Sequence, residues 1–199
     1  QQAQKTFEHV AQLLSARDPY TFEHSNQVAD LAEQMARKLK LNQDHIEQIR
    51  SAAIIHDIGK LGVPDRILQK PGSLTEDEWV IMKKHPEIGA DLLKDLEIDA
   101  YIIDVVRHEH ERSDGSGYPK GLQGKEIPIG ARIVAVADVY NALPTDRPYR
   151  PAYSQEEAIR MMREMRGVKL DAQVVDALFC VLEDLSAQAA YAPMKVGVL

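Results

Sequence analysis

Apolar residues recur at the three- and four-residue spacing of amphipathic helices along most of the chain, and no segment shows the sustained alternation of a strand. Val28, Leu31 and Met35, for example, would share one helical face. The pattern predicts eight helices. In chain order, they are one that ends near Arg17, one that carries Val28 to Leu39, one that follows Asn42, one from Thr75 to His85, one from Ile98 to Glu109, one around Asp138, one that begins at Ser154 and one that follows Asp171. We therefore expect an all-α fold.

Local signals support several of these boundaries. Thr75 and Glu78 have the spacing of a capping box, in which each side chain binds the backbone amide of the other residue. Ser154 and Glu157 have the same spacing. Gly59 is suited to end the helix that follows Asn42.

The length of 199 residues is enough for one good-sized domain. We expect this domain to occupy residues 1–186 and a weakly ordered tail to occupy residues 187–199. A glycine-rich loop from Ser113 to Pro128 separates two of the expected helices. Because the chain begins with Gln1 rather than methionine, we expect it to be a domain excised from a longer protein.

Composition narrows the class of protein. Hydrophobic residues make up 44% of the chain and charged residues 28%, which is ordinary for a soluble globular protein. No apolar run approaches the roughly 18 residues of a membrane span, and no secretory signal is present. Cys180 has no cysteine partner, so we expect it to pack in the core of a cytoplasmic protein. A net charge of −7 argues against DNA binding but not against a small anionic substrate.

Polar residues occupy positions at which the helical pattern expects apolar ones. They are His56, Asp57, Glu109 and Asp138. A buried carboxylate without a partner is costly, so several such groups from separate helices suggest one shared metal site. Imidazole mixed with carboxylate suits Fe, Mn, Zn or Co better than Ca or Mg. Two such ions would clamp a phosphoryl group and activate a water, which points to hydrolysis.

The same residue types also have structural explanations. A lone histidine is more often a hydrogen-bonded structural residue than a ligand, and we interpret His9 and His45 in that way. His56-Asp57 taken alone fits either explanation. His108 fits a packing role or a supporting role beside the ligands.

Two motifs resemble one known family. His56-Asp57-Ile58-Gly59-Lys60 resembles the signature of HD metal-dependent phosphohydrolases, and Gly117-Tyr118-Pro119 resembles the mark of the HD-GYP subfamily. The similarity covers residues 15–180 and extends through Lys70-Pro71-Gly72-Ser73-Leu74-Thr75, His85-Pro86, Ala131 to Asp138 and Asp146-Arg147-Pro148-Tyr149-Arg150.

The resemblance implies a single HD-type helical bundle with a GYP loop and C-terminal helices. It implies a bacterial signalling enzyme that hydrolyses cyclic di-GMP to pGpG through a hydroxide bridging two metal ions, with further cleavage to GMP left open. The ions would be iron or manganese, with zinc, cobalt or nickel as alternatives. Cyclic GMP-AMP or another nucleotide is an alternative substrate, and a catalytically weak module that binds cyclic di-GMP is an alternative role. The resemblance also allows two kinds of partner. One is a GGDEF-type or other signalling protein that binds the GYP loop, and the other is a second copy of this chain in a homodimer.

The resemblance also implies roles for individual residues. The implied metal ligands are His24, His56, Asp57, His85, Glu109, His110 and Asp138, with Asp57 between the ions. Asp57 and Lys60 would be catalytic, and Lys60, Arg147 and Arg150 would contact substrate phosphates. A surface salt bridge is the alternative for the two arginines. Tyr118 would contact a guanine or a partner protein, unless the glycine-rich loop is only a tight structural turn.

Four positions depart from the family pattern. Glu109 stands where many relatives have histidine, and its added negative charge would alter metal preference or lower activity. Tyr20 stands where members with three metals have glutamate, so we expect two ions. Asn141 and Pro144 replace aspartate and threonine, and we expect these changes to reshape the substrate loop without affecting the ligands.

Overall fold

The computed structural model describes residues 21–96, 98–145 and 152–191, and this part of the chain consists of helices, turns and two isolated β-bridges. The α-helices are α2 (Thr21–Lys38), α3 (Gln43–Ile55), α4 (Asp65–Leu68), α5 (Glu76–Met82), α6 (His85–Asp95), α7 (Ala100–His108), α8 (Ile129–Ala142), α9 (Gln155–Met165) and α10 (Ala172–Tyr191). Two short 3-10 helices are η1 (His56–Gly62) and η2 (Gly124–Glu126). The expected all-α class is confirmed. None of the described helices is long and apolar enough to cross a membrane.

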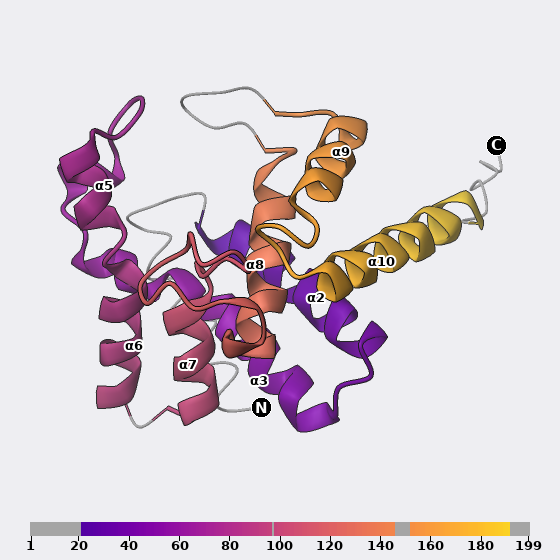
Figure 1. Ribbon diagram of the computed structural model, residues 1–199, viewed down its shortest axis with the longest axis horizontal. Helices are drawn as coiled ribbons and strands as arrows, with labels where there is room; N and C mark the ends of the chain where they lie inside the picture. The colour runs from indigo at the N-terminus through magenta and orange to yellow at the C-terminus, as the bar shows by residue number, and fades with distance from the viewer. Residues whose placement is uncertain (1–20, 97, 146–151, 192–199) are drawn as a thin grey trace, which may run out of the picture.

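Helix α8 is the central helix of the bundle and packs against α2, α3, α7 and α10 (Figure 1). Ala131 and every residue from Ile133 to Ala137 are buried. A helix that is apolar on all sides must be surrounded by other elements, which explains its central position. Asp138 follows this apolar run directly, so the helix carries its carboxylate to the edge of the core, where the side chain is 21% exposed.

The amphipathic helices expected from the sequence supply the rest of the core. Val28 and Met35 of α2 are fully buried, as is Ile49 of α3. Both capping boxes are confirmed, at Thr75 before α5 and at Ser154 before α9. The helix expected to end near Arg17 lies outside the described residues. The expectation that Cys180 packs in the core was wrong, because this residue lies on the exposed face of α10.

The chain changes from α-helix to 3-10 helix where the His56-Asp57 motif begins. We expected the α-helix to continue through Asp57 and to end at Gly59, but α3 ends at Ile55. Both His56 and Asp57 are nevertheless buried, as expected. Gly59 serves a different purpose: a Cβ atom there would lie 1.7 Å from the carbonyl oxygen of His85. The glycine therefore lets η1 and α6 meet backbone to backbone.

The helix expected to extend from Thr75 to His85 ends before His85, and a second helix begins at that residue. Helix α5 ends at Met82, and Pro86 lies in the first turn of α6. Proline lacks an N–H donor, so it fits the first turn of a helix and not its interior. The break makes His85 the first residue of α6.

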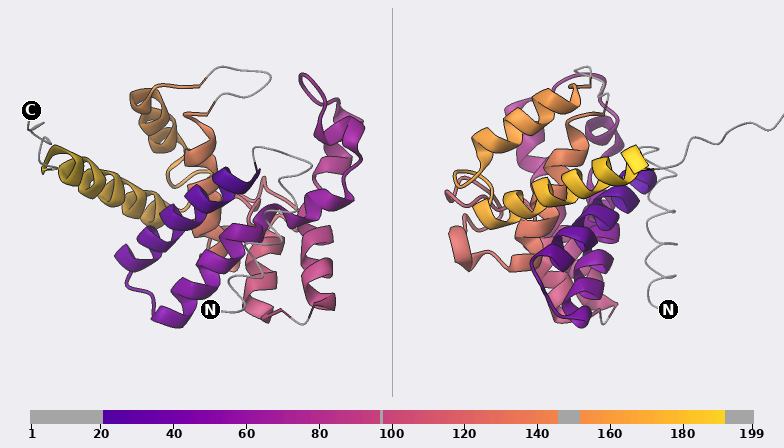
Figure 2. Two further views of the ribbon diagram at one scale, coloured as in Figure 1. Left: turned by 180° about the vertical axis from the view of Figure 1, so that it is seen from behind. Right: turned by 90° about the vertical axis from the view of Figure 1, so that its right-hand side faces the viewer.

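The C-terminal helix is longer than expected. Helix α10 continues to Tyr191, whereas we expected order to weaken from Ala187. Residues 186–191 contain no glycine or proline, and alanine has the highest helix propensity of all residues. Figure 2 shows the end of α10 extending beyond the other helices. Residues 192–199 lie outside the described part of the chain.

Candidate metal centre

The seven expected metal ligands come from five segments of the chain and converge on one region. His24 lies in the first turn of α2, His56 and Asp57 begin η1, His85 begins α6, Glu109 and His110 follow α7, and Asp138 lies near the end of α8. Within the described residues, these side chains form overlapping groups in which the ligand atoms all lie within 4.8 Å of one another.

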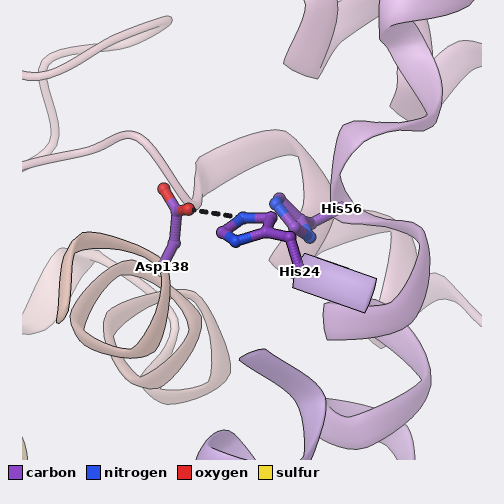
Figure 3. Close-up of side chains that lie close together, drawn as sticks. All are labelled: His24, His56 and Asp138. Atoms are coloured by element: carbon purple, nitrogen blue, oxygen red, sulfur yellow. Dashed lines mark hydrogen bonds and ion pairs between the residues drawn. The ribbon is translucent and has the colours of Figure 1, made fainter. Parts of the chain in front are cut away.

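The first group consists of His24, His56 and Asp138. Figure 3 shows the two imidazole rings and the carboxylate side by side, with His24 between the other two. Nε2 of His24 lies 3.0 Å from Oδ1 of Asp138. The ring centroids of His24 and His56 are 5.7 Å apart.

The second group consists of His85, Glu109 and His110. The Nε2 atoms of His85 and His110 lie 3.1 Å apart. Oε1 of Glu109 lies 3.9 Å from Nε2 of His85 and 3.8 Å from Nε2 of His110. Two imidazole nitrogens and a carboxylate oxygen thus face a common point.

Two carboxylates join the groups. Asp57 directs Oδ2 toward Nε2 of His56, at 3.4 Å, and Oδ1 toward Nε2 of His85, at 3.7 Å. Glu109 directs Oε2 toward Nε2 of His56, at 4.0 Å, and Oε1 toward His85. Each carboxylate therefore offers one oxygen to each side of the centre.

The surroundings of the Glu109 carboxylate show whether these residues fit a metal ion. The side chain of Glu109 is buried, and neither carboxylate oxygen has a hydrogen-bond partner in the described part of the chain. Burial, together with the charges of Asp57 and Asp138, raises the pKa of Glu109 well above its ordinary value. A buried carboxylate needs a proton, a donor or a cation, and imidazole nitrogens lie on both sides of this one. A divalent ion satisfies that requirement, so the donor set fits a metal.

Backbone carbonyls orient two of the imidazoles. Nδ1 of His56 donates to the carbonyl oxygen of Ala53 at 2.7 Å, and Nδ1 of His85 donates to that of Met82 at 2.9 Å. When Nδ1 carries the proton, the lone pair is on Nε2. Both Nε2 atoms face the centre, which is the arrangement that metal-binding histidines adopt.

His24 is oriented by a residue that the sequence did not assign to the site. Nδ1 of His24 lies 2.7 Å from Oδ1 of Asn141, whose Nδ2 donates to Oε1 of Gln27 at 2.9 Å. We expected the change to Asn141 to leave the ligands unaffected, and the structure shows that its side chain contacts one of the proposed ligands. Asn141 lies three positions after Asp138 on α8, so it projects from nearly the same face. That spacing was a signal in the sequence that could have revealed the contact.

The charges of the centre are distributed unevenly. Burial would raise the pKa of Asp57, but Lys60 and the neighbouring histidines outweigh it and hold the pKa well below its usual range. Nζ of Lys60 lies 2.7 Å from Oδ2 of Asp57. Burial and the nearby His85 lower the pKa of His110 to about 3, which keeps its imidazole neutral and able to bind a metal.

The remaining candidates fall into three classes. Tyr118 stacks on His110, with ring centroids 4.9 Å apart and planes 24° apart. His108 turns Nδ1 toward the backbone oxygen and the carboxylate of Asp104, at 3.0 Å each, which gives it a structural role. Tyr20, His9, Arg147 and Arg150 lie outside the described residues.

Comparison with known proteins agrees with this centre. A family model described as the HD domain matches residues 8–174. The chain is 40% identical to a cyclic di-GMP phosphodiesterase response regulator of Xanthomonas campestris, over 98% of this chain and 53% of that protein. It is 44% identical to a cyclic di-GMP phosphodiesterase of Pseudomonas aeruginosa, over 82% of this chain and 40% of that protein.

A relative with a different substrate is about as similar. The chain is 39% identical to a 3′3′-cGAMP-specific phosphodiesterase of Vibrio cholerae, over 85% of this chain and 39% of that protein. The chain thus spans about half or less of the length of these relatives. Among solved structures, an HD-GYP-type protein of Bdellovibrio bacteriovorus has a TM-score of 0.68 at 23% identity, over 91% of this chain and 61% of that one. That likeness supports the fold.

Proposed function

The chain belongs to the HD domain family, and from this membership and the geometry of the centre we propose that it is a metal-dependent phosphodiesterase of bacterial second-messenger signalling. Its proposed substrate is cyclic di-GMP, which it converts to pGpG, and cleavage of pGpG to GMP is a further step of the same chemistry. Curated relatives at 40% and 44% identity are named for cyclic di-GMP.

One observation carries the proposal. The two oxygens of Asp57 face His56 on one side and His85 on the other, so a single carboxylate connects two groups of ligand atoms. A lone metal site would need only one of these groups. A site with two adjoining positions is suited to phosphodiester hydrolysis, in which both the attacking and the leaving oxygen need stabilisation.

We propose that two divalent ions, most suitably iron or manganese, are held by the two groups. His24, His56 and Asp138 would hold one ion, His85, Glu109 and His110 the other, and Asp57 would contact both. When bound, such ions acidify a water molecule and neutralise charge on the phosphoryl oxygens. His56, Asp57, His85 and Glu109 are buried, which limits the access of bulk water to this part of the centre, and the carbonyls behind His56 and His85 keep each Nε2 directed inward.

Lys60 is proposed to act on the substrate directly. It lies 2.7 Å from Asp57, and its side chain is 25% exposed, so its ammonium group can also donate to a phosphoryl oxygen at the edge of the centre. Arg147 and Arg150 are proposed to hold a phosphate, and Tyr118 is proposed to line the substrate site beside His110. Water attacks phosphorus, the bond to the 3′-oxygen breaks, and a proton passes to that oxygen.

Cyclic GMP-AMP is the second candidate substrate. A relative named for it is 39% identical to this chain, close to the values for relatives named for cyclic di-GMP. The test is anaerobic loading with Fe(II) or Mn(II), followed by chromatography of the products formed from each cyclic dinucleotide. We expect pGpG from cyclic di-GMP at the higher rate. A higher rate with cyclic GMP-AMP would change the assigned substrate but keep the reaction.

A variant pair separates an enzyme from a binding module. Asp57→Ala should abolish turnover while the helical circular dichroism signal is retained, whereas Asp30→Ala, which removes an exposed carboxylate of α2, should keep full turnover. Stoichiometric binding of cyclic di-GMP without formation of pGpG by the metal-loaded protein would instead establish a receptor.

A further inference from the structure

Glu111 is a second buried glutamate beside His110, and its environment is the opposite of that of Glu109. It is 2% exposed, yet both of its oxygens have partners. Oε1 accepts the backbone N–H of Lys120 at 2.6 Å, and Oε2 accepts that of Leu122 at 3.0 Å. Hydrogen bonds to a carboxylate are about twice as strong as those between neutral groups. The carboxylate of Glu111 therefore binds the backbone of the glycine-rich loop rather than a metal ion.

The loop that Glu111 holds is seated tightly on the ligand segment. A Cβ atom at Gly117 would lie 2.4 Å from the backbone nitrogen of Arg112 and 2.5 Å from the carbonyl oxygen of His110. The backbone N–H of Tyr118 donates to that same carbonyl oxygen at 3.2 Å. The ring of Tyr118 then lies nearly parallel to the ring of His110. Backbone and side chain of Tyr118 thus both contact one proposed ligand.

The base of the loop is closed by contacts that do not involve Glu111. The N–H of Gly124 donates to the carbonyl oxygen of Ser113 at 3.1 Å, and the N–H of Ser113 donates to that of Lys169 at 2.9 Å. An isolated β-bridge joins Asp114 and Gln123. Loss of the Glu111 carboxylate would therefore leave the base of the loop in place and release its middle, which carries Tyr118.

We propose that Glu111 is a positioning residue that holds the glycine-rich loop over the metal centre, so that Tyr118 stays stacked on His110 and fixes the orientation of its imidazole. The proposal rests on the proposed function in one respect, that His110 binds a metal. Glu111 acts only through Tyr118, because its own oxygens are occupied by the amides of Lys120 and Leu122.

The first test compares Glu111→Gln with Glu126→Gln in the whole chain. Glu126 also accepts a backbone N–H in this loop, from Gln123 at 2.9 Å, but it is exposed. In the Glu111 variant the side-chain amide would direct an NH₂ group at a backbone donor. We expect faster hydrogen exchange at the amides of Lys120 and Leu122 and roughly tenfold weaker Mn(II) binding, the range found when an outer partner of a metal ligand is lost. The Glu126 variant should change neither quantity.

The second test asks whether the effect passes through Tyr118. Mn(II) affinity is measured for Glu111→Gln, for Tyr118→Ala and for the double variant. If Glu111 acts through Tyr118, the double variant binds Mn(II) about as weakly as Tyr118→Ala alone. Additive losses, or faster amide exchange with unchanged Mn(II) affinity, would overturn the proposal. If the glutamine variant does not fold, Glu111→Asp keeps the charge on a shorter arm and is measured in the same way. A wild-type protein that fails to bind Mn(II) would refute the proposed metal centre, and the role of Glu111 toward His110 with it, whatever the exchange data show for the loop.

Discussion

Nδ1 of His24 lies 2.7 Å from Oδ1 of Asn141, although the two residues are 117 positions apart in the chain. The amide group of Asn141 is itself fixed, because its Nδ2 donates to Gln27. Asn141 must therefore present its oxygen to His24, which places the proton of the imidazole on Nδ1 and leaves Nε2 for the centre. The sequence suggested that Asn141 would change the substrate loop, and the structure shows that its side chain contacts His24, one of the proposed metal ligands.

Replacement of Asn141 should weaken metal binding. We expect Asn141→Ala to lower Mn(II) affinity by about 10- to 100-fold, because His24 loses the acceptor that fixes its tautomer. Asn141→Asp, which restores a carboxylate at this distance, should bind Mn(II) at least as tightly as the wild type. Titration of the metal-free protein with Mn(II) checks both. Equal affinities for the alanine variant and the wild type would show that the contact has no influence on the metal.

Glu109 should make the metal-free protein less stable as the pH rises. Burial and the charges of Asp57 and Asp138 raise its pKa above the ordinary value of 4.5, so the folded protein holds this proton more tightly than the unfolded chain does. The contribution of Glu109 to the free energy of unfolding therefore falls from pH 4.5 upward, through the raised pKa.

Glu109→Gln should remove this dependence. At pH 8 we expect the metal-free variant to exceed the wild type in free energy of unfolding by about 1–3 kcal/mol, and at pH 4 we expect little difference. Urea denaturation at the two pH values measures this. The exposed Glu47→Gln variant serves as the control, with changes within about 0.5 kcal/mol at both. A difference for Glu109→Gln of the same size at both pH values would contradict the prediction.

Gly59 should not tolerate a side chain. In Gly59→Ala the added Cβ would lie 1.7 Å from the carbonyl oxygen of His85 and 2.6 Å from the backbone nitrogen of Gly89, so η1 and α6 must separate. We expect a loss of about 3 kcal/mol in the free energy of unfolding and weaker metal binding. Gly62→Ala is the matched control, since its Cβ would meet only side-chain atoms of Ile88, at 3.0 Å. Equal losses in the two variants would argue against the backbone contact.

Lys60 should matter for turnover more than for folding. We expect Lys60→Ala to lower kcat/KM by about 100-fold, because it removes a donor next to the phosphoryl position. Lys70→Ala removes a lysine that also has a carboxylate partner, Glu78 at 2.6 Å, but on the surface. It should change kcat/KM by less than about twofold. Steady-state kinetics of the metal-loaded variants provides the comparison. A small effect of Lys60→Ala on kcat/KM would mean that Lys60 only supports Asp57 and does not act on the substrate.

Helix type and helix length show where sequence patterns fail. Both capping boxes were predictable because they depend on residues three positions apart. The switch to 3-10 helix at His56 was not, since it accompanies the close approach of Gly59 to the backbone of α6, far along the chain. The division between α5 and α6 was readable in principle from Pro86, whose missing N–H favours a helix start.

The sequence by itself determined the all-α class, the burial of His56 and Asp57, and the set of residues that meet at the centre, because periodicity and ordered motifs are local or family-wide properties. Only the tertiary structure decided that Glu109 lacks a hydrogen-bond partner among the described residues while Glu111 has two, and that Asn141 orients His24. These outcomes depend on which distant backbone or side chain comes within hydrogen-bond distance. Residue type and spacing along one chain do not specify that.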